Sequence, residues 1–208
     1  MLAFEVVVVG TSTGGLKALQ TLLSGLPSEF SLPIVIAQHR AKDLESGLCE
    51  YLAESSRLPV NEPDDKEPLL AGHVYLAPRD YHLLIENRSF ALSTAQFVRF
   101  ARPSIDVLFE SAADAFQART IGVILTGANT DGAQGLATIK SRGGFTIVED
   151  PASAVARELP EAAIAQAAPD RILALDQIAA CLVTLIESQH SNQLLRPGAA
   201  GTAIHYGR

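Results

Sequence analysis

The segment at residues 6–15 combines an apolar run with a glycine-rich turn, and it constrains the fold more than any other part of the chain. Residues 6–9 are four consecutive valines, which are typical of a strand buried on both faces in a parallel sheet. Gly10, Gly14 and Gly15 supply the conformational freedom that a tight turn needs, and leucines at helical spacing follow them. The segment therefore predicts a strand, a turn and a helix, the unit from which α/β folds are built.

Ser12 lies on this predicted turn, and three functions fit its position. Gly10-x-Ser12-x-Gly14 has the spacing of a nucleophile elbow, in which small flanking residues let a strained turn present a hydroxyl to a substrate. A glycine-rich turn before a helix also binds phosphate groups. Alternatively, Ser12 or Thr13 caps the helix. The turn alone does not choose among a nucleophile, a phosphate site and a cap.

The rest of the chain alternates between apolar runs of strand length and segments with helical spacing. This alternation predicts an α/β fold with a single doubly wound, mostly parallel sheet, helices on both faces and a local antiparallel hairpin. The expected strands are residues 33–37, 72–78, 121–125, 145–148 and 172–175, the expected helices are 16–26, 44–52, 105–116, 133–142, 160–168 and 177–188, and the hairpin is 81–93 with its turn at Asn87 and Arg88.

Two helix starts and the chain's end complete this outline. Asp43 is expected to cap the second helix, and Ser104 is expected to cap the third, where Asp106 favours the first turn. We expect one domain over residues 1–190. Residues 191–208 show no periodicity and are expected to form an irregular C-terminal tail.

The composition argues against several classes of partner. The 208 residues include 16 Lys and Arg against 23 Asp and Glu, a net charge of −7, and no basic cluster is interleaved with aromatic residues, so we expect no nucleic-acid partner. No apolar run approaches the ~20 residues that span a bilayer, and no secretory signal precedes the first strand. We therefore expect a cytoplasmic protein with no membrane insertion. Cys49 and Cys181 lie outside metal-ligand or redox spacings, so we expect reduced cysteines, no metal and no cofactor.

Polar residues with complementary chemistry follow three of the predicted strands. Ser12 follows the first strand, His39 the second, and Asp131 lies in the turn after the strand at 121–125. Ligands of open parallel α/β sheets bind beyond the carboxyl ends of the strands, so these residues are expected to converge. In a hydrolytic triad, His39 would accept the Ser12 proton, and Asp131 would fix the tautomer of the imidazole and stabilise its charge.

Each member of this set also has a purely structural interpretation. His39 fits a hydrogen-bonded residue at a strand end, and Asp131, directly before Gly132 and a helix, fits an N-cap of that helix. The order Ser, His, Asp along the chain excludes the α/β-hydrolase fold, whose acid precedes its histidine. The triad is favoured because all three residues are expected at the same edge of one sheet.

Five segments, taken together, form a specific pattern. They are residues 9–15 (Val-Gly-Thr-Ser-Thr-Gly-Gly), 37–39 (Ala-Gln-His), 72–78 (Gly-His-Val-Tyr-Leu-Ala-Pro), 102–109 (Arg-Pro-Ser-Ile-Asp-Val-Leu-Phe), and 122–127 (Gly-Val-Ile-Leu-Thr-Gly) with 131–133 (Asp-Gly-Ala). With these segments the chain closely resembles the catalytic domain of the chemotaxis protein-glutamate methylesterases (CheB). The resemblance extends from about residue 4 to residue 188, nearly the whole chain apart from its tail.

The resemblance implies hydrolysis of glutamate γ-methyl esters on chemoreceptor signalling helices, with release of methanol, and deamidation of certain receptor glutamines. Ser12, His39 and Asp131 match the family's nucleophile, base and acid. The backbone N–H of Thr13 is our candidate oxyanion donor, and Ala128 and Arg102 are candidates for contacts with the substrate. The implied partner is the cytoplasmic domain of a methylated chemoreceptor or similar receptor, and control by a separate regulatory chain is compatible with this.

The chain departs from the family pattern at several positions. Residues 126–132 read Thr-Gly-Ala-Asn-Thr-Asp-Gly where the family commonly has Thr-Gly-Met-Gly-x-Asp-Gly, so Ala128 replaces a methionine that borders the site. Arg40 also stands where methionine is usual, and residues 156–160 replace a segment that often contains Gly-Met-Pro. Arg40 would favour an acidic neighbour of the target. Because the first strand begins near residue 4, the N-terminal receiver domain of typical members is expected to be absent.

Three other functions remain compatible with the sequence. The first is a nucleotide- or phosphate-binding module that uses the turn at residues 10–15, although it has neither Gly-x-Gly-x-x-Gly nor a P-loop. The second is a catalytically idle signalling scaffold. The third is an esterase that acts on something other than a chemoreceptor.

Overall fold

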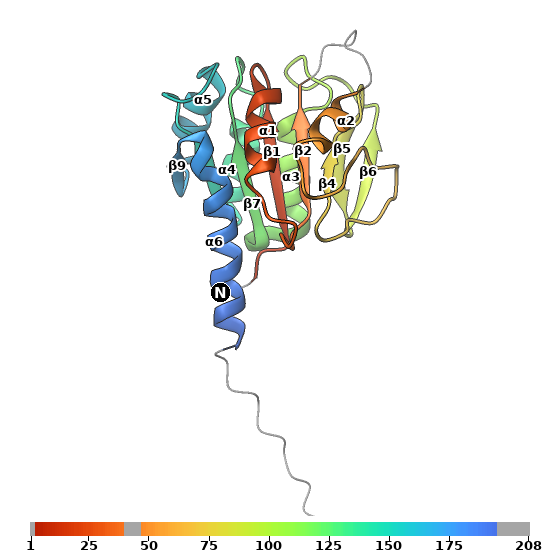
Figure 1. Ribbon diagram of the computed structural model, residues 1–208. Coiled ribbons are helices and arrows are strands. Elements are labelled where there is room, and N and C mark those ends of the chain that lie inside the picture. Colours follow the sequence, from red (N-terminus) through yellow and green to blue (C-terminus); the bar gives the residue numbers. More distant parts are fainter. Residues whose placement is uncertain (1–2, 40–46, 195–208) are drawn as a thin grey trace, which may run out of the picture.

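A parallel sheet of seven strands forms the centre of the computed structural model, which describes residues 3–39 and 47–194 and side chains up to residue 188 (Figure 1). Every pair of neighbouring strands in this sheet is parallel. In spatial order the strands are β3 (Val60–Asn61), β4 (Val74–Leu76), β2 (Ile34–Gln38), β1 (Val6–Thr11), β7 (Thr120–Ile124), β8 (Phe145–Glu149) and β9 (Arg171–Leu173). The expected doubly wound α/β fold is confirmed.

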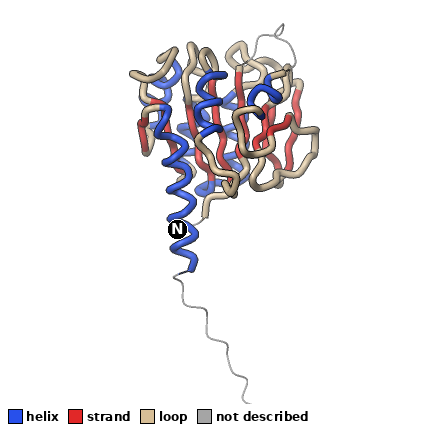
Figure 2. Tube along the Cα trace, in the orientation of Figure 1, coloured by secondary structure: helices blue, strands red, loops and turns tan. Residues whose placement is uncertain are grey.

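Helices cover both faces of the sheet, and a hairpin lies beside it (Figure 2). The hairpin strands β5 (His82–Glu86) and β6 (Ser89–Ser93) pair with each other as a separate antiparallel sheet, as predicted. The helices are α1 (Gly15–Ser24), α2 (Leu48–Ala53), α3 (Ile105–Phe116), α4 (Ala133–Ser141), α5 (Glu158–Ala167) and α6 (Leu175–Leu194), with a 3-10 turn at Gln117–Arg119.

The valine run of β1 explains why both faces must be covered. Val6 and Val8 pack into the core shared with α3, α4 and α5, whereas Val7 and Val9 pack into the core shared with α1 and α6. All four side chains are completely buried. Because full burial of a valine contributes about 1.5–3 kcal/mol, the four valines favour a position for β1 between two helical layers.

The order of the strands brings three strand ends together. From β1 the chain passes to β2 on one side, and it later returns to β7 on the other side. Gly10 of β1 is level with Ala37 of β2 and with Ile124 of β7. The loops that follow these strands therefore meet at one edge, next to the point where the winding direction reverses, where ligands of such sheets bind.

Several predicted boundaries differ from the observed ones. No side chain caps α1, because its N-cap is Gly14 in the left-handed region (φ +82°). Helix α6 continues to Leu194, so the first residues of the expected tail are helical, while residues 195–208 lie outside the described part. Residues 40–46 also lie outside it, so the expectations for Arg40 and Asp43 rest on the sequence alone. Ser104 caps α3 as predicted, since its hydroxyl accepts the Val107 N–H.

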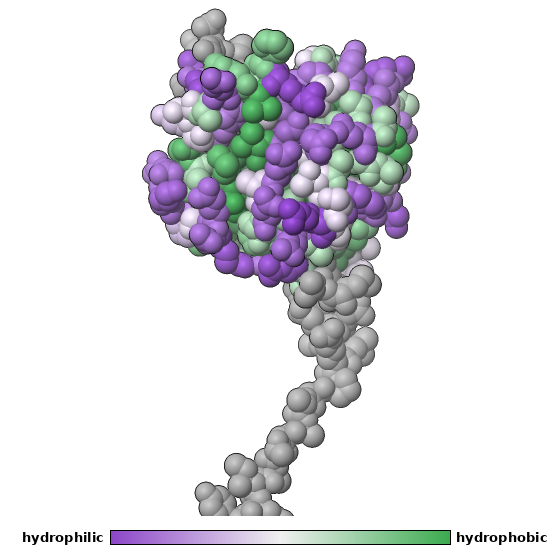
Figure 3. Space-filling view, turned by 180° about the vertical axis from the view of Figure 1, so that it is seen from behind, coloured by the Kyte–Doolittle hydropathy of each residue, from purple (hydrophilic) through white to green (hydrophobic). Residues whose placement is uncertain are grey.

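Seen from behind, hydrophobic side chains form a band between hydrophilic flanks (Figure 3). A groove of about 520 Å³ lies between β5 and α3, and it is lined by Leu84, Ile85, Glu86, Asn87, Val107, Glu110, Ser111, Asp114 and Ala115. None of these residues follows the carboxyl end of a strand of the central sheet. The groove is therefore separate from the edge to which the sequence pattern points.

Candidate active site

The turn between β1 and α1 presents the Ser12 side chain at the carboxyl edge of the sheet. Ser12 donates its backbone N–H to the Thr126 carbonyl at 3.0 Å, and its own carbonyl accepts the Gly15 N–H at 2.9 Å. Gly14 needs its positive φ, but Gly10 is required for another reason. A Cβ at Gly10 would lie 2.2 Å from Ile105 Cγ2, so this glycine allows close packing rather than conformational freedom, contrary to our expectation for it.

Thr126 fixes the turn after β1 by hydrogen bonds. The Thr126 hydroxyl donates to the Thr13 carbonyl at 2.9 Å and accepts the Ala156 N–H at 2.8 Å, while the Thr126 carbonyl also accepts the Thr11 hydroxyl at 2.8 Å. The Thr126 N–H donates to the buried carboxyl group of Glu149 at 2.8 Å. Burial raises the pKa of Glu149, and that N–H partly offsets the rise. The loop after β7 thus fixes the turn that carries Ser12 through one residue, Thr126.

Gln38, the last residue of β2, connects the serine turn to the histidine. Its amide nitrogen donates to the Ser12 carbonyl at 3.0 Å and to the His39 carbonyl at 2.9 Å. The Gln38 side chain is buried, so these bonds form away from competing water. They hold the two strand ends at a fixed separation.

His39 lies between Ser12 and Asp131. Its Nδ1 is 3.2 Å from Ser12 Oγ, and its Nε2 is 2.7 Å from Asp131 Oδ2. An ionised carboxylate only accepts hydrogen bonds, so Nε2 carries the imidazole proton, and Nδ1 has a lone pair within reach of the serine hydroxyl. The His39 side chain is 12% exposed and that of Asp131 is fully buried. The structure therefore brings together the three residues that the sequence pattern selected.

Asp131 is held as an anion by donors from α3. Its Oδ2 accepts the Ile105 N–H at 2.7 Å, and its Oδ1 accepts the Ser104 hydroxyl at 2.8 Å and the Asp106 N–H at 3.2 Å. Burial by itself would raise the pKa of Asp131, but the hydrogen bonds from His39, Ile105 and Ser104 outweigh it and lower the pKa. The N-cap of α4 is Gly132, so Asp131 does not cap the helix that follows it, as its position alone suggested.

Asn129 is a site residue that we did not single out from the sequence. Its Nδ2 lies 2.7 Å from His39 Nδ1 and 3.5 Å from Ser12 Oγ, and its Oδ1 accepts the Asp131 N–H at 3.1 Å. The available signal was its place two residues before Asp131, where the family pattern has glycine. A polar side chain in a loop after a strand, close to a candidate site residue such as Asp131, is a reason to include it.

The other predicted site residues lie at different distances from the chemistry. Thr13 directly follows Ser12 with an exposed side chain, and Ala128 is exposed on the loop that carries Asn129. Arg102 instead donates to Asp80 Oδ1 at 2.7 Å and to the carbonyls of Thr94 and Ala95 at 2.8 Å and 3.0 Å. Its guanidinium thus anchors the chain after the hairpin, and these contacts do not support its predicted role in substrate binding.

The buried histidine on the hairpin has a structural role. His82 Nε2 lies 3.0 Å from the Gln96 carbonyl, and His82 Nδ1 accepts the Ser104 N–H at 3.2 Å.

In residues 3–39 and 47–194, no group of His, Cys, Asp and Glu side chains is arranged to hold a metal ion. No helix in that part of the chain is long and apolar enough to cross a membrane.

A hydroxyl, an imidazole and a buried carboxylate that contact one another in a row are typical of a hydrolase. Here they lie at the carboxyl edge of a parallel α/β sheet. The chain belongs to the CheB methylesterase family, whose model matches residues 7–182. The crystal structure of the Thermotoga maritima CheB methylesterase catalytic domain is similar, with a TM-score of 0.84 and 34% identity, and covers 88% of this chain and 100% of that chain.

Curated relatives agree with this family. A relative from Leptospira interrogans, named for protein-glutamate methylesterase and protein-glutamine glutaminase, is 43% identical over 183 residues, which cover 88% of this chain and 95% of that protein. Protein-glutamate methylesterase/protein-glutamine glutaminase 2 of Anaeromyxobacter dehalogenans is 44% identical over 174 residues, which cover 84% of this chain and 51% of that protein. The chain thus spans about half the length of the second relative.

Proposed function

We propose that the chain is a serine hydrolase that removes methyl groups from glutamate γ-methyl esters on chemoreceptor signalling helices and deamidates receptor glutamines. The observation that carries this proposal is the continuous relay from Ser12 Oγ to His39 Nδ1 at 3.2 Å and from His39 Nε2 to Asp131 Oδ2 at 2.7 Å. The names of the Leptospira and Anaeromyxobacter relatives support the substrate class.

In the first half of the reaction, Ser12 Oγ attacks the ester carbonyl carbon while its proton passes to His39 Nδ1. Asp131, which accepts the Nε2–H, stabilises the positive charge that the imidazole then carries. The proton moves from Nδ1 to the methoxy oxygen as the C–O bond breaks, and methanol leaves. The glutamate side chain remains bound to Ser12 as an ester.

In the second half, His39 Nδ1 takes a proton from water, and the hydroxide attacks the acyl carbon. Ser12 leaves with that proton, and the free glutamate side chain is released. In both halves negative charge develops on the carbonyl oxygen. The backbone N–H of Thr13 is our candidate donor for this charge, because it belongs to the peptide that joins Ser12 to Thr13, whose carbonyl accepts the Gly15 N–H and the Gln38 amide.

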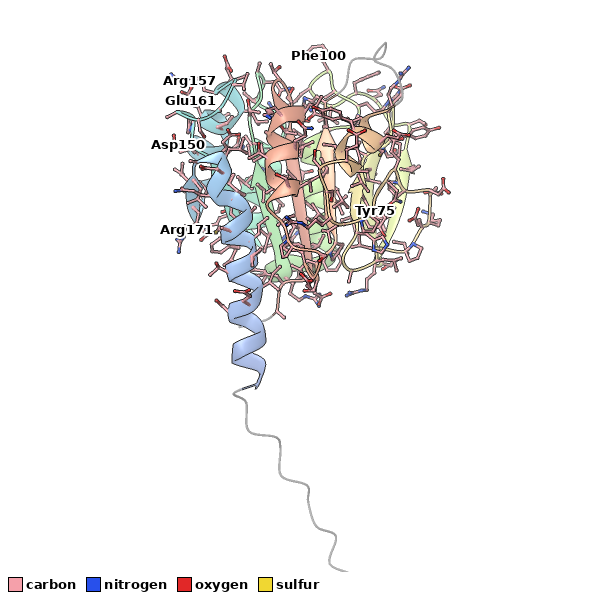
Figure 4. The ribbon with its side chains drawn as sticks, in the orientation of Figure 1. Tyr75, Phe100, Asp150, Arg157, Glu161 and Arg171 are labelled. Atoms are coloured by element: carbon pink, nitrogen blue, oxygen red, sulfur yellow. The ribbon has the colours of Figure 1, made fainter. Side chains whose placement is uncertain are left out.

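Apolar side chains at the rim of the site support a protein substrate. Phe100 is fully exposed, and Figure 4 shows it at the upper end of the molecule, where the loops after the parallel strands lie. Its neighbour Arg99 donates to the Thr130 hydroxyl at 3.1 Å, which ties this rim segment to the catalytic loop. Val155 is 73% exposed and lies against Gly14 of the nucleophile turn. Exposed apolar groups beside a polar site are typical of surfaces that contact other proteins.

The test is methanol release from membranes that carry methylated receptors. Ser12→Ala should abolish release because it removes only the nucleophilic oxygen at a surface turn. Ser24→Ala, at the exposed end of α1, is the matched control and should behave as the unaltered protein. A Ser12→Ala variant with unaltered turnover would overturn the proposal. Hydrolysis of a generic ester without methanol release would instead favour an esterase with another substrate.

A further inference from the structure

The Asn129 side chain makes three hydrogen bonds in the described part of the chain, and all of them go to the proposed catalytic residues. Its Oδ1 accepts the backbone N–H of Asp131 at 3.1 Å. This bond fixes the orientation of the amide, because a reversed amide would place its NH₂ group against that N–H. The Nδ2–H groups of Asn129 must therefore face His39 Nδ1 at 2.7 Å and Ser12 Oγ at 3.5 Å.

This arrangement places a donor beside the atom through which every proton of the reaction passes. His39 Nδ1 has one lone pair, and Asn129 N–H lies closer to it than the Ser12 hydroxyl at 3.2 Å does. Once Nδ1 holds the serine proton, it becomes a donor, and the Asn129 N–H no longer has an acceptor there. The leaving atom must approach Nδ1 to take that proton, so it comes within reach of the Asn129 N–H.

We propose that Asn129 is a specificity-determining residue that favours ester over amide substrates by donating a hydrogen bond to the leaving oxygen. This inference rests on the proposed function and deepens it, because it distinguishes demethylation from deamidation at the same site. Its physical basis is the different number of lone pairs on the two leaving atoms.

The ester oxygen of the tetrahedral intermediate has two lone pairs. One takes the proton from His39 Nδ1 while the C–O bond breaks, and the other accepts the Asn129 N–H. The electron pair of the broken bond stays on the oxygen, so methanol leaves as a neutral molecule. Asn129 thus stabilises negative charge that develops on the oxygen during bond cleavage.

The amide nitrogen of the corresponding intermediate has only one lone pair. That pair takes the proton from Nδ1, and the resulting –NH₃⁺ group offers only N–H donors to its surroundings until ammonia leaves with the electrons of the broken C–N bond. The Asn129 N–H finds no lone pair on this leaving group, and it can donate only to His39 Nδ1, which has lost its proton again. Asn129 therefore stabilises the departure of methanol but adds nothing to the departure of ammonia, so it favours demethylation over deamidation.

The experiment compares two peptides that differ only in a glutamate γ-methyl ester or a glutamine at the target position. The kcat for methanol release and the kcat for ammonia release are measured separately for each variant. We expect Asn129→Ala to lower kcat for the ester about tenfold, which corresponds to the loss of one hydrogen bond to a charged group. Because the amide kcat should not fall, the ester-to-amide ratio should drop by about the same factor.

A second variant and a control make the result specific. Asn129→Asp keeps the acceptor for the Asp131 N–H but has no donor for the leaving oxygen, so it should also lower the ratio even if Asn129→Ala folds poorly. Asn61→Ala removes an asparagine from β3, away from the site, and should leave the ratio unchanged. Fluorophosphonate labelling of Ser12 in each variant verifies that the nucleophile turn is intact.

The possible outcomes separate the two proposals. Methanol release by the unaltered protein, with an ester-to-amide ratio that stays within about twofold in both Asn129 variants, would overturn the role of Asn129 and leave the proposed function standing. No methanol release from either peptides or receptor membranes would overturn the proposed function itself. A ratio that falls in both variants and not in Asn61→Ala supports the inference.

Discussion

Asp106 and Asp131 each accept backbone hydrogen bonds from the start of the other's helix. Asp131 binds the start of α3, which carries Asp106, and Asp106 binds the start of α4, which follows Asp131. Asp131 precedes α4, yet its carboxylate accepts the N–H groups of Ile105 and Asp106 at the start of α3. Asp106 lies in the first turn of α3, yet its Oδ1 accepts the N–H groups of Gly132 and Gly135 at the start of α4, at 2.8 Å and 2.7 Å. This exchange joins the two helices and fixes the proposed catalytic acid, Asp131, between them.

The carboxyl of Asp106 should make stability depend on pH. Burial, with the nearby charge of Asp131, raises the pKa of Asp106 to about 6. A carboxyl group whose pKa is raised in the folded state binds its proton more tightly there, so the stability it contributes is lost as pH rises from about 4 to about 6. The size of this loss is on the order of 2–3 kcal/mol for such a shift.

Asp106→Asn should remove this contribution while keeping the Oδ1 that caps α4. Urea unfolding at several pH values between 4 and 7 measures it as the difference in unfolding free energy between the variant and the unaltered protein, which should grow in favour of the variant toward pH 7. Asp114→Asn, at an exposed ion pair with Arg142, is the control. A difference that does not vary over this pH range would contradict the expectation.

Neutralising Asp131, the proposed catalytic acid, should lower activity far more than stability. Asp131→Asn keeps the shape of the side chain but can present the wrong hydrogen-bonding group to His39 Nε2, and triad enzymes lose about 10⁴ in kcat for such a change. Because Asp131 also accepts donors from α3, we expect a loss of about 1–2 kcal/mol in unfolding free energy as well. Methanol release and chemical unfolding measure the two effects. Turnover within about tenfold of the unaltered protein would exclude the assigned role.

Packing between Gly10 and Ile105 should be visible in a double-mutant cycle. Gly10→Ala places a methyl group against Ile105 Cγ2, which should lower the unfolding free energy by about 1–3 kcal/mol. In an Ile105→Ala background the same change should cost clearly less, because the clashing methyl is gone. Unfolding of the two single variants and the double variant gives the coupling energy. Additive effects would show that the two residues do not compete for the same space.

Phe100 should affect protein substrates but not small ones. Phe100→Ala removes an exposed ring from the rim without touching the relay, so KM for methylated receptors should rise several-fold while kcat for a small ester stays the same. Phe97→Ala serves as the comparison, because it removes a ring of the same size from the same region. The Phe97 ring lies beneath the Arg102 guanidinium at 4.5 Å and is less exposed than that of Phe100. If KM for receptors does not change in Phe100→Ala, the rim is not where the receptor docks.

Local patterns were sufficient to predict most of the fold. The valine run, the hairpin turn at Asn87 and Arg88 and the Ser104 cap depend on residues that are neighbours in the sequence, and the structure contains all three. Ser12 and His39 were predictable for a related reason. Parallel strands end at the same edge of a sheet, so a residue directly after a strand has a defined location before any contact is known.

The finer features of the site depend on contacts between distant segments, and only the tertiary structure decided them. Asp131 serves α3 rather than α4 because the donors of α3, some 25 positions away, point at its carboxylate. Arg102 is occupied by Asp80, and Asn129 faces His39, because loops from separate strands meet at one edge. The amino-acid sequence determined which chemistry was available at each strand end, by periodicity and turn residues. Which groups pair there follows from the packing of α3 against α4 and against β1, which no local pattern encodes.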